Sequence, residues 1–111
     1  MEEKDEILAL LKPLVEDLVN GKLALIRETG RSGPYTVEEL QEQLDDYGGT
    51  LTAPPETDYQ NLDLYEIDDE PEWVLEYDLW IDGEKSDLTL TCTLRLTDQE
   101  QSIIIDSIHV L

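Results

Sequence analysis

The clearest pattern in the chain is a period-two alternation of apolar and polar residues over its last forty positions. The run Trp73–Ile81 alternates in this way, and the run Leu88–Thr97 repeats the pattern with apolar residues on one side and mostly threonines on the other. A side-chain period of two is the geometry of an extended strand with one buried and one solvated face. Polar segments at 82–86 and 98–101 separate these runs from each other and from a third run, Ser102–Leu111. The pattern predicts an antiparallel meander with one buried face.

The third run changes phase within its length, and a further short strand precedes the meander. The apolar residues before and after the change are Ile103 and Ile105, then Ile108 and Val110. One extra residue in a strand shifts the phase in this way, so we expect a β-bulge near Asp106–Ser107. Residues 62–67 predict a first short strand, which the acidic turn 68–71 connects to the meander. Tyr65 and Tyr77 are predicted to lie in the core or at its edge.

Apolar residues three and four positions apart predict helices in the first half of the chain. Residues 4–20 carry one broad apolar stripe, and residues 22–28 could add one or two further turns. Pro13 lies inside the stripe, so this segment forms either one kinked helix or two short ones. A helix over 37–47 is predicted with Thr36 as its N-cap, because a glutamate three residues later completes a capping box.

Residues 50–60, with Pro54–Pro55 at their centre, predict an extended connection between the two halves. The order is therefore two or three helices followed by four strands, in a single domain that spans 1–111. Such segregation argues for an α+β fold in which the helices pack on one face of a curled four-stranded antiparallel sheet. This order is similar to that of cystatin-like, nuclear-transport-factor-2-like cones, an analogy of architecture that does not fix a function.

Length and composition narrow the class of protein. A chain of 111 residues with 40% hydrophobic residues can bury one core. Its apolar runs are all shorter than the roughly 20 residues that span a bilayer, and its acidic first residues are unlike a signal peptide. The single cysteine excludes an internal disulfide and suits a reducing compartment. We therefore expect a cytoplasmic protein.

The net charge is the most unusual property of the sequence. The chain has 28 Asp and Glu against 7 Lys and Arg, which gives a formal charge of −21. Such a surface repels nucleic acid and anionic lipid and attracts basic proteins. Between Ser32 and Glu84 the sequence contains acids but no Lys or Arg. Because self-repulsion on this scale costs stability, we interpret the charge as kept for a basic partner; the alternative is a solubilising or salt-adapted surface.

Candidate catalytic and metal-binding groups are few. Cys92 and His109 are the single residues of their types and could form a nucleophile–base pair across the last two strands. Cys92 shares the apolar side of its strand with leucines, however, which is typical of a small buried hydrophobe. The acidic turn offers oxygen ligands without the spaced order of a calcium loop. We therefore expect no catalytic residues, no metal and no cofactor.

Several short strings in the second part of the chain carry a resemblance to a known class of protein. They are Tyr47–Leu51, Pro54–Pro55, Asp78–Trp80, Ser86–Leu90 and Ile108–Leu111. Over roughly 44–111 the chain resembles small bacterial proteins that are similar to the immunity proteins of polymorphic-toxin and contact-dependent growth inhibition systems. The resemblance implies a small cytoplasmic protein, often acidic, that blocks a cognate toxin by binding it directly. It implies no catalytic residue.

The leading hypothesis is an immunity-type protein, not an enzyme, that neutralises a basic toxin domain, in first place a nuclease. A carboxylate-rich surface can occupy a nuclease site as a mimic of phosphate. The candidate partner-binding residues lie around the first strand turn and on the outer sheet face: Glu66, Asp68, Asp69, Glu70, Glu72, Asp78 and Trp80. Trp80 is either an exposed aromatic anchor or a residue that packs under a neighbouring loop or a second protomer.

The alternative hypothesis is a small-ligand-binding domain or enzyme with nuclear-transport-factor-2-like architecture. Its pocket would lie between the helices and the sheet, with His109 or Tyr77 among the polar groups. The sequence leaves open a monomer or a homodimer that pairs through the outer sheet face.

Overall fold

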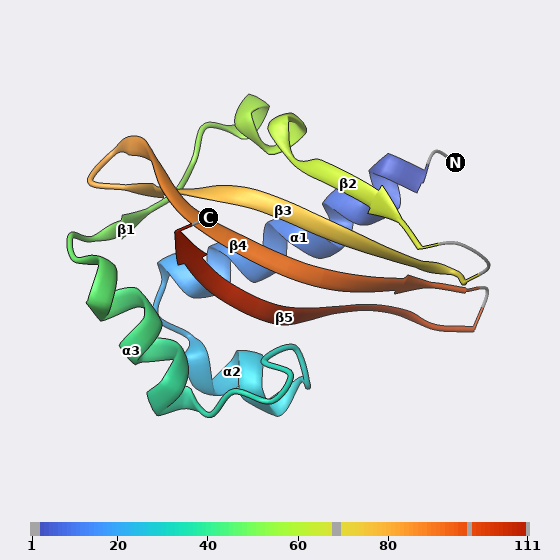
Figure 1. Cartoon of the computed structure of the whole chain (residues 1–111), viewed down its shortest axis with the longest axis horizontal. Coiled ribbons are helices and arrows are strands. Elements are labelled where there is room, and N and C mark those ends of the chain that lie inside the picture. Colours follow the sequence, from blue (N-terminus) through green and yellow to red (C-terminus); the bar gives the residue numbers. More distant parts are fainter. Residues whose placement is uncertain (1–2, 68–69, 98, 111) are drawn as a thin grey trace.

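Three helices precede five strands in the computed structural model, which describes residues 3–67, 70–97 and 99–110. The helices are α1 (Glu3–Val19), α2 (Leu23–Glu28) and α3 (Val37–Tyr47), with a short 3-10 helix, η1 (Glu56–Asn61). The strands are β1 (Leu51–Thr52), β2 (Asp63–Glu66), β3 (Glu72–Ile81), β4 (Glu84–Leu96) and β5 (Gln101–Val110). This order, with the helices followed by an antiparallel sheet, confirms the predicted α+β fold (Figure 1).

The helices form where apolar spacing and capping residues predict them. α1 is one helix that continues through Pro13, and its apolar stripe is buried. At the start of α3, the backbone N–H of Glu39 donates to Thr36 Oγ1 at 3.1 Å, and the backbone N–H of Thr36 donates to Glu39 Oε1 at 3.0 Å. This reciprocal pair is the predicted capping box, which fixes the first turn because it satisfies two amides that lack helical partners.

β1 and β2 pair with the same edge of β3, near its two ends. The sheet has the order β1–β3–β4–β5, and β2 pairs with β3 beside this path. β1 lies opposite Trp80 and Ile81, whereas β2 lies opposite 73–76. The edge of β3 over 77–79 therefore lies between the two short strands. η1 connects β1 to β2 and lies beside this gap (Figure 1).

The sheet has five strands rather than the four that periodicity predicts. β1 contains only Leu51–Thr52, which is too short to show an alternation in the sequence. The prediction of an extended connection over 50–60 is wrong for its second half, because η1 begins directly after Pro55. Proline has a φ fixed near the helical value and no backbone N–H, so Pro55 can stand directly before the first turn of η1.

Two features of the long strands can be compared with the prediction from the sequence: one agrees with it and the other does not. Thr91 lies opposite Ser107 and Cys92 opposite Ile105, which leaves Asp106 as the extra residue of β5. This register shift confirms the predicted bulge. β4 begins at Glu84, directly after the two-residue turn 82–83, whose two residues both have positive φ. The polar residues 84–86 therefore continue the strand and do not interrupt it.

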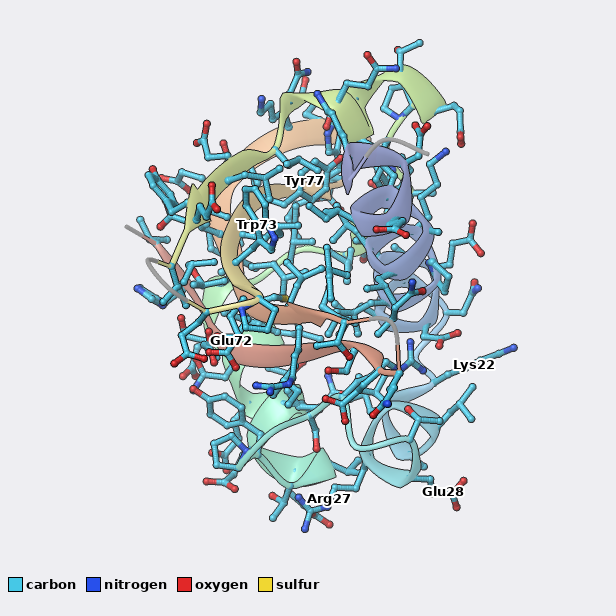
Figure 2. The ribbon with its side chains drawn as sticks, turned by 90° about the vertical axis from the view of Figure 1, so that its right-hand side faces the viewer. Lys22, Arg27, Glu28, Glu72, Trp73 and Tyr77 are labelled. Atoms are coloured by element: carbon cyan, nitrogen blue, oxygen red, sulfur yellow. The ribbon has the colours of Figure 1, made fainter. Side chains whose placement is uncertain are left out.

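The core lies between α1 and one face of the sheet. On the sheet it is formed by alternate residues of the three long strands: Leu75, Tyr77, Leu79, Leu90, Cys92, Leu94, Ile103 and Ile105. Figure 2 shows the labelled Trp73 and Tyr77 on the side of the sheet that faces α1. Each fully buried Leu or Ile stabilises the fold by about 1.5–3 kcal/mol. Because strand side chains alternate, the residues between these point to the opposite face, here called the outer face.

The loop 29–34 covers part of the free edge of β5. The backbone N–H of Ile105 donates to the carbonyl of Arg31 at 2.8 Å. Arg31 is held in turn by Asp17 of α1, with Nη2 and Oδ2 2.6 Å apart in a largely buried ion pair. Gly33 has φ +61° and lies so close to β5 that an added Cβ would be 2.8 Å from the Ile105 carbonyl oxygen. The loop therefore follows the strand closely only because residue 33 lacks a side chain.

Candidate functional site: the acidic outer face of the sheet

The outer face carries carboxylate groups that lie beside threonine and serine hydroxyl groups. Figure 1 shows α1 behind the sheet and α2 and α3 beside β5, so no described helix lies over the outer face. The register of the strands places the following residues on it: Asp63 and Tyr65 of β2; Glu72, Val74, Glu76, Asp78 and Trp80 of β3; Lys85, Thr89, Thr91, Thr93 and Arg95 of β4; Ser102, Ile104, Asp106, Ser107 and His109 of β5.

Negative charge dominates this face. Its acidic residues are Asp63, Glu72, Glu76, Asp78 and Asp106, and the described residues that form it include two bases, Arg95 and, opposite Trp80 near the hairpin turn, Lys85. Arg95 is itself paired, with its Nη1 3.1 Å from Glu72 Oε2 and its Nε 3.2 Å from Glu100 Oε1. The middle of the face therefore carries uncompensated carboxylates, which attract cations and basic side chains.

Threonine hydroxyl groups hold two of the carboxylates in place. Thr89 Oγ1 donates to Asp78 Oδ1 at 2.9 Å, and Thr93 Oγ1 donates to Asp106 Oδ2 at 2.6 Å. A carboxylate has about four acceptor positions, so one neutral donor fixes its orientation and leaves the other positions for an incoming N–H group. These two side chains are thus ordered acceptors for the charge-assisted bonds that Lys and Arg make.

The structure separates the residues that the sequence grouped around the strand turn. Glu72 and Asp78 lie on the outer face, the position that the alternation within the strand predicts for Asp78. Glu66 lies opposite Trp73, which is in phase with the core, so it belongs to the helix-facing side at the exposed end of β2. Glu70 is exposed in the turn, and Asp68 and Asp69 lie outside the described residues. Glu66, at the turn end of β2, therefore points away from the face on which Glu72 and Asp78 lie, because a one-residue step along a strand reverses the side-chain direction.

Trp80 is engaged within the protein. Its Nε1 donates to Asp58 Oδ2 at 2.8 Å, so the indole is half-buried against η1. Of the possibilities that the sequence left open, this is packing under a neighbouring loop. Tyr77 Oη donates to the same oxygen at 2.6 Å, and Asn61 Nδ2 donates to Asp58 Oδ1 at 3.0 Å. Burial acts to raise the pKa of Asp58, but the three donors outweigh it and hold that pKa below its ordinary value.

The two tyrosines predicted to be in the core have different positions. Tyr77 is buried, and its ring stacks on that of Tyr59 with a centroid separation of 5.6 Å. Tyr65 is 54% exposed on the outer face, so the prediction is wrong for this residue. The Glu76 carboxylate beside it raises the pKa of the Tyr65 phenol. Asp63 and Tyr65 are two residues apart, so they lie on the same face of β2. Which face this is depends on the register of β2 with β3, and the sequence does not show that register.

Cys92 and His109 lie on opposite faces of the sheet. Cys92 is fully buried in the core, and burial raises the pKa of its thiol far above the ordinary value. His109 pairs with Thr89 and is exposed on the outer face. The nucleophile–base pair considered from the sequence is therefore not formed, since the sheet itself separates the two side chains.

Besides a hollow of about 210 Å³ between the helices and the sheet, lined by Leu18, Leu44 and Leu51 among others, hollows lie beside β5. One of about 410 Å³ opens where the loop 29–31 meets the start of β5, lined by Leu10, Arg31, Arg95, Gln101 and Ile103 among others. His109 borders a second, of about 350 Å³, between α3 and the end of β5. In the described part of the chain no group of three or more His, Cys, Asp and Glu could hold a metal ion. Within the same ranges, no helix is long and apolar enough to cross a membrane.

Comparison with models of protein families identifies one family that matches the sequence. Residues 15–111 match the family described as a domain of unknown function, DUF7668. The matched range contains all the strands and most of the helical residues. The chain belongs to this family. Neither a search of curated proteins nor a search of solved structures gave a match for this DUF7668 domain.

Proposed function

We propose that this DUF7668 domain is an immunity-type protein that binds and neutralises a basic protein, with a toxin nuclease as the first candidate for this partner. The observation that supports the proposal is the outer face, where uncompensated carboxylates of three strands lie side by side with no described helix above them. A nuclease lines its active site with Lys and Arg to bind phosphate, so a face of ordered carboxylates can take the place of the nucleic acid. Direct binding in the cytoplasm is the mode of action that follows.

The charge of the whole chain supports the same proposal through the rate of association. A formal charge of −21 extends the attraction beyond the contact surface. Opposite charges raise the association rate constant by one to three orders of magnitude at low ionic strength, and salt removes this gain. Several bases of the chain are engaged with its own groups: Arg31 with Asp17, Arg95 with Glu72, and Lys12 with Glu56. These pairs leave the excess of acid to face a partner.

The first test identifies the partner. The tagged protein is immobilised, exposed to its native lysate with the neighbouring gene product co-expressed, and washed at low and then high salt. We expect one basic protein to be retained in stoichiometric amount. A column that retains no basic protein at low salt would contradict the proposal.

The second test localises binding to the outer face. We expect the triple variant Asp63→Asn, Glu76→Gln, Asp78→Asn to reduce the association rate constant about tenfold at low salt and to flatten its salt dependence. Glu42→Gln, Asp45→Asn, Asp46→Asn on α3 removes the same number and types of charge elsewhere and is the matched control. Equal losses in the two triple variants would show that net charge alone, and not this face, attracts the partner.

A further inference from the structure

An apolar row crosses the outer face through all four strands that form it. Tyr65 lies opposite Val74, Val74 opposite Thr93, and Thr93 opposite Ile104. Tyr65 is 54% exposed and Ile104 37% exposed, and both are among the large apolar side chains that are exposed in the described part of the chain. With strands about 4.8 Å apart, the row is about 14 Å long. These four residues, three of them apolar and the fourth a threonine whose hydroxyl donates to Asp106, are here called the apolar row.

The charges around the apolar row are distributed unequally. On one side lie the carboxylates of Asp63, Glu76 and Asp106, with that of Asp78 behind them. On the other side, Arg95 lies between the carboxylates of Glu72 and Glu100 and compensates part of their charge. A ligand that fits this surface therefore has apolar groups over the row and most of its positive charges on the flank of Asp63, Glu76 and Asp106.

We infer that the partner contacts this face through an amphipathic basic segment of protein chain. Its apolar side chains lie along the apolar row, and its Lys or Arg side chains bond to the carboxylates on the flank. This inference rests on the proposed function and makes it more specific, because a purely basic surface would leave Tyr65 and Ile104 uncovered. A central apolar contact surrounded by polar groups is the arrangement that gives an interface most of its affinity.

Charge complementarity selects this occupant over a second copy of the chain. Two outer faces brought together would place the flanking carboxylates of both copies within one desolvated layer, where like charges repel strongly. Nucleic acid is opposed by the same charges. A basic protein segment satisfies the carboxylates and covers the apolar row at once.

Two synthetic peptides of equal length and charge separate the apolar from the electrostatic contribution. In one the lysines are separated by leucine, and in the other by serine. We expect the wild-type protein to bind the Lys–Leu peptide about tenfold more tightly than the Lys–Ser peptide at low salt. In the double variant Tyr65→Thr, Ile104→Thr, which keeps β-forming residues, we expect this ratio to approach one while the Kd for Lys–Ser stays the same.

The control is Val110→Thr, which changes an exposed apolar strand residue outside the row and is expected to keep the full ratio. A ratio near one in the wild type, or a ratio that the double variant leaves intact, would overturn the inference even if both peptides bind. Binding of neither peptide at low salt would instead count against the proposed function. A wild-type dimer in sedimentation that the double variant abolishes would show that the apolar row pairs two copies, and would also overturn the inference.

Discussion

Trp80 and Asp58 are joined by a hydrogen bond of 2.8 Å that attaches η1 to the edge of β3. Tyr77 donates to the same carboxylate oxygen, although it precedes Trp80 by three residues and is buried in the core. Both side chains reach Asp58 because η1 passes the part of the β3 edge that β1 and β2 leave unpaired. One carboxylate thereby holds the connection between the helical half and the meander.

We expect Asp58→Ala to lower the free energy of unfolding by about 2–4 kcal/mol, because the buried Tyr77 hydroxyl and the Trp80 indole lose their acceptor. Asp58→Asn keeps an oxygen that can accept from them and is expected to cost about 1–2 kcal/mol. Urea denaturation followed by tryptophan fluorescence measures both values. Asp63→Ala, an exposed residue of the neighbouring strand, should cost less than about 0.5 kcal/mol. Equal stability of the wild type and Asp58→Ala would show that η1 is held by other contacts.

The Asp58 carboxyl also predicts a pH dependence. Its pKa is lowered in the folded protein, so the unfolded chain binds the proton more readily. Its contribution is therefore present at neutral pH and is lost as the pH falls through about 4 and below, towards the folded pKa. We expect the stability difference between the wild type and Asp58→Asn to be constant from pH 7 to about 5 and to shrink on further acidification. A difference that grows as the pH falls would contradict the assigned sign.

The fold could be predicted largely from local patterns, because these act through neighbouring residues. The capping box of Thr36 and Glu39 and the phase change at Asp106 are each legible in a few consecutive positions. β1 could not be predicted, since a strand of two residues is defined by its partner, here Trp80 and Ile81 of β3. Tertiary pairing, and not propensity, decides such segments.

The candidate site was only partly predictable for the same reason. The outward direction of Asp78 follows from alternation within β3, whereas the outward position of Tyr65 depends on the register between two strands. The bond from Trp80 to Asp58 joins residues that are 22 positions apart and requires the path of η1. Contacts between elements therefore determined the part of the surface that the sequence pattern did not show.

Gly33 offers a test of how the loop covers β5. We expect Gly33→Ala to lower the free energy of unfolding by about 2–4 kcal/mol, because a Cβ would collide with the Ile105 carbonyl at a residue whose positive φ already disfavours alanine. Gly30→Ala is the matched control: Gly30 has φ +77°, but its added Cβ would meet no atom within 4 Å. Its cost, about 1 kcal/mol, measures the backbone strain alone. Equal costs for the two variants in urea denaturation would show that the loop moves away from β5 freely.

The excess of negative charge predicts that salt stabilises the protein. Repulsion among 28 acidic residues, opposed by only 7 basic ones, is stronger in the compact state than in the unfolded chain. A salt that screens this repulsion should therefore raise Tm, steeply up to about 0.2 M, where the Debye length falls below about 8 Å, and only slightly beyond. Thermal scans in sodium chloride measure the effect, and sucrose, which stabilises by exclusion without screening, is the control. A Tm that is independent of chloride would mean that the acids are spaced widely enough to repel weakly. The outer face would then be kept at no cost in stability, and its carboxylates would no longer require a partner to explain them.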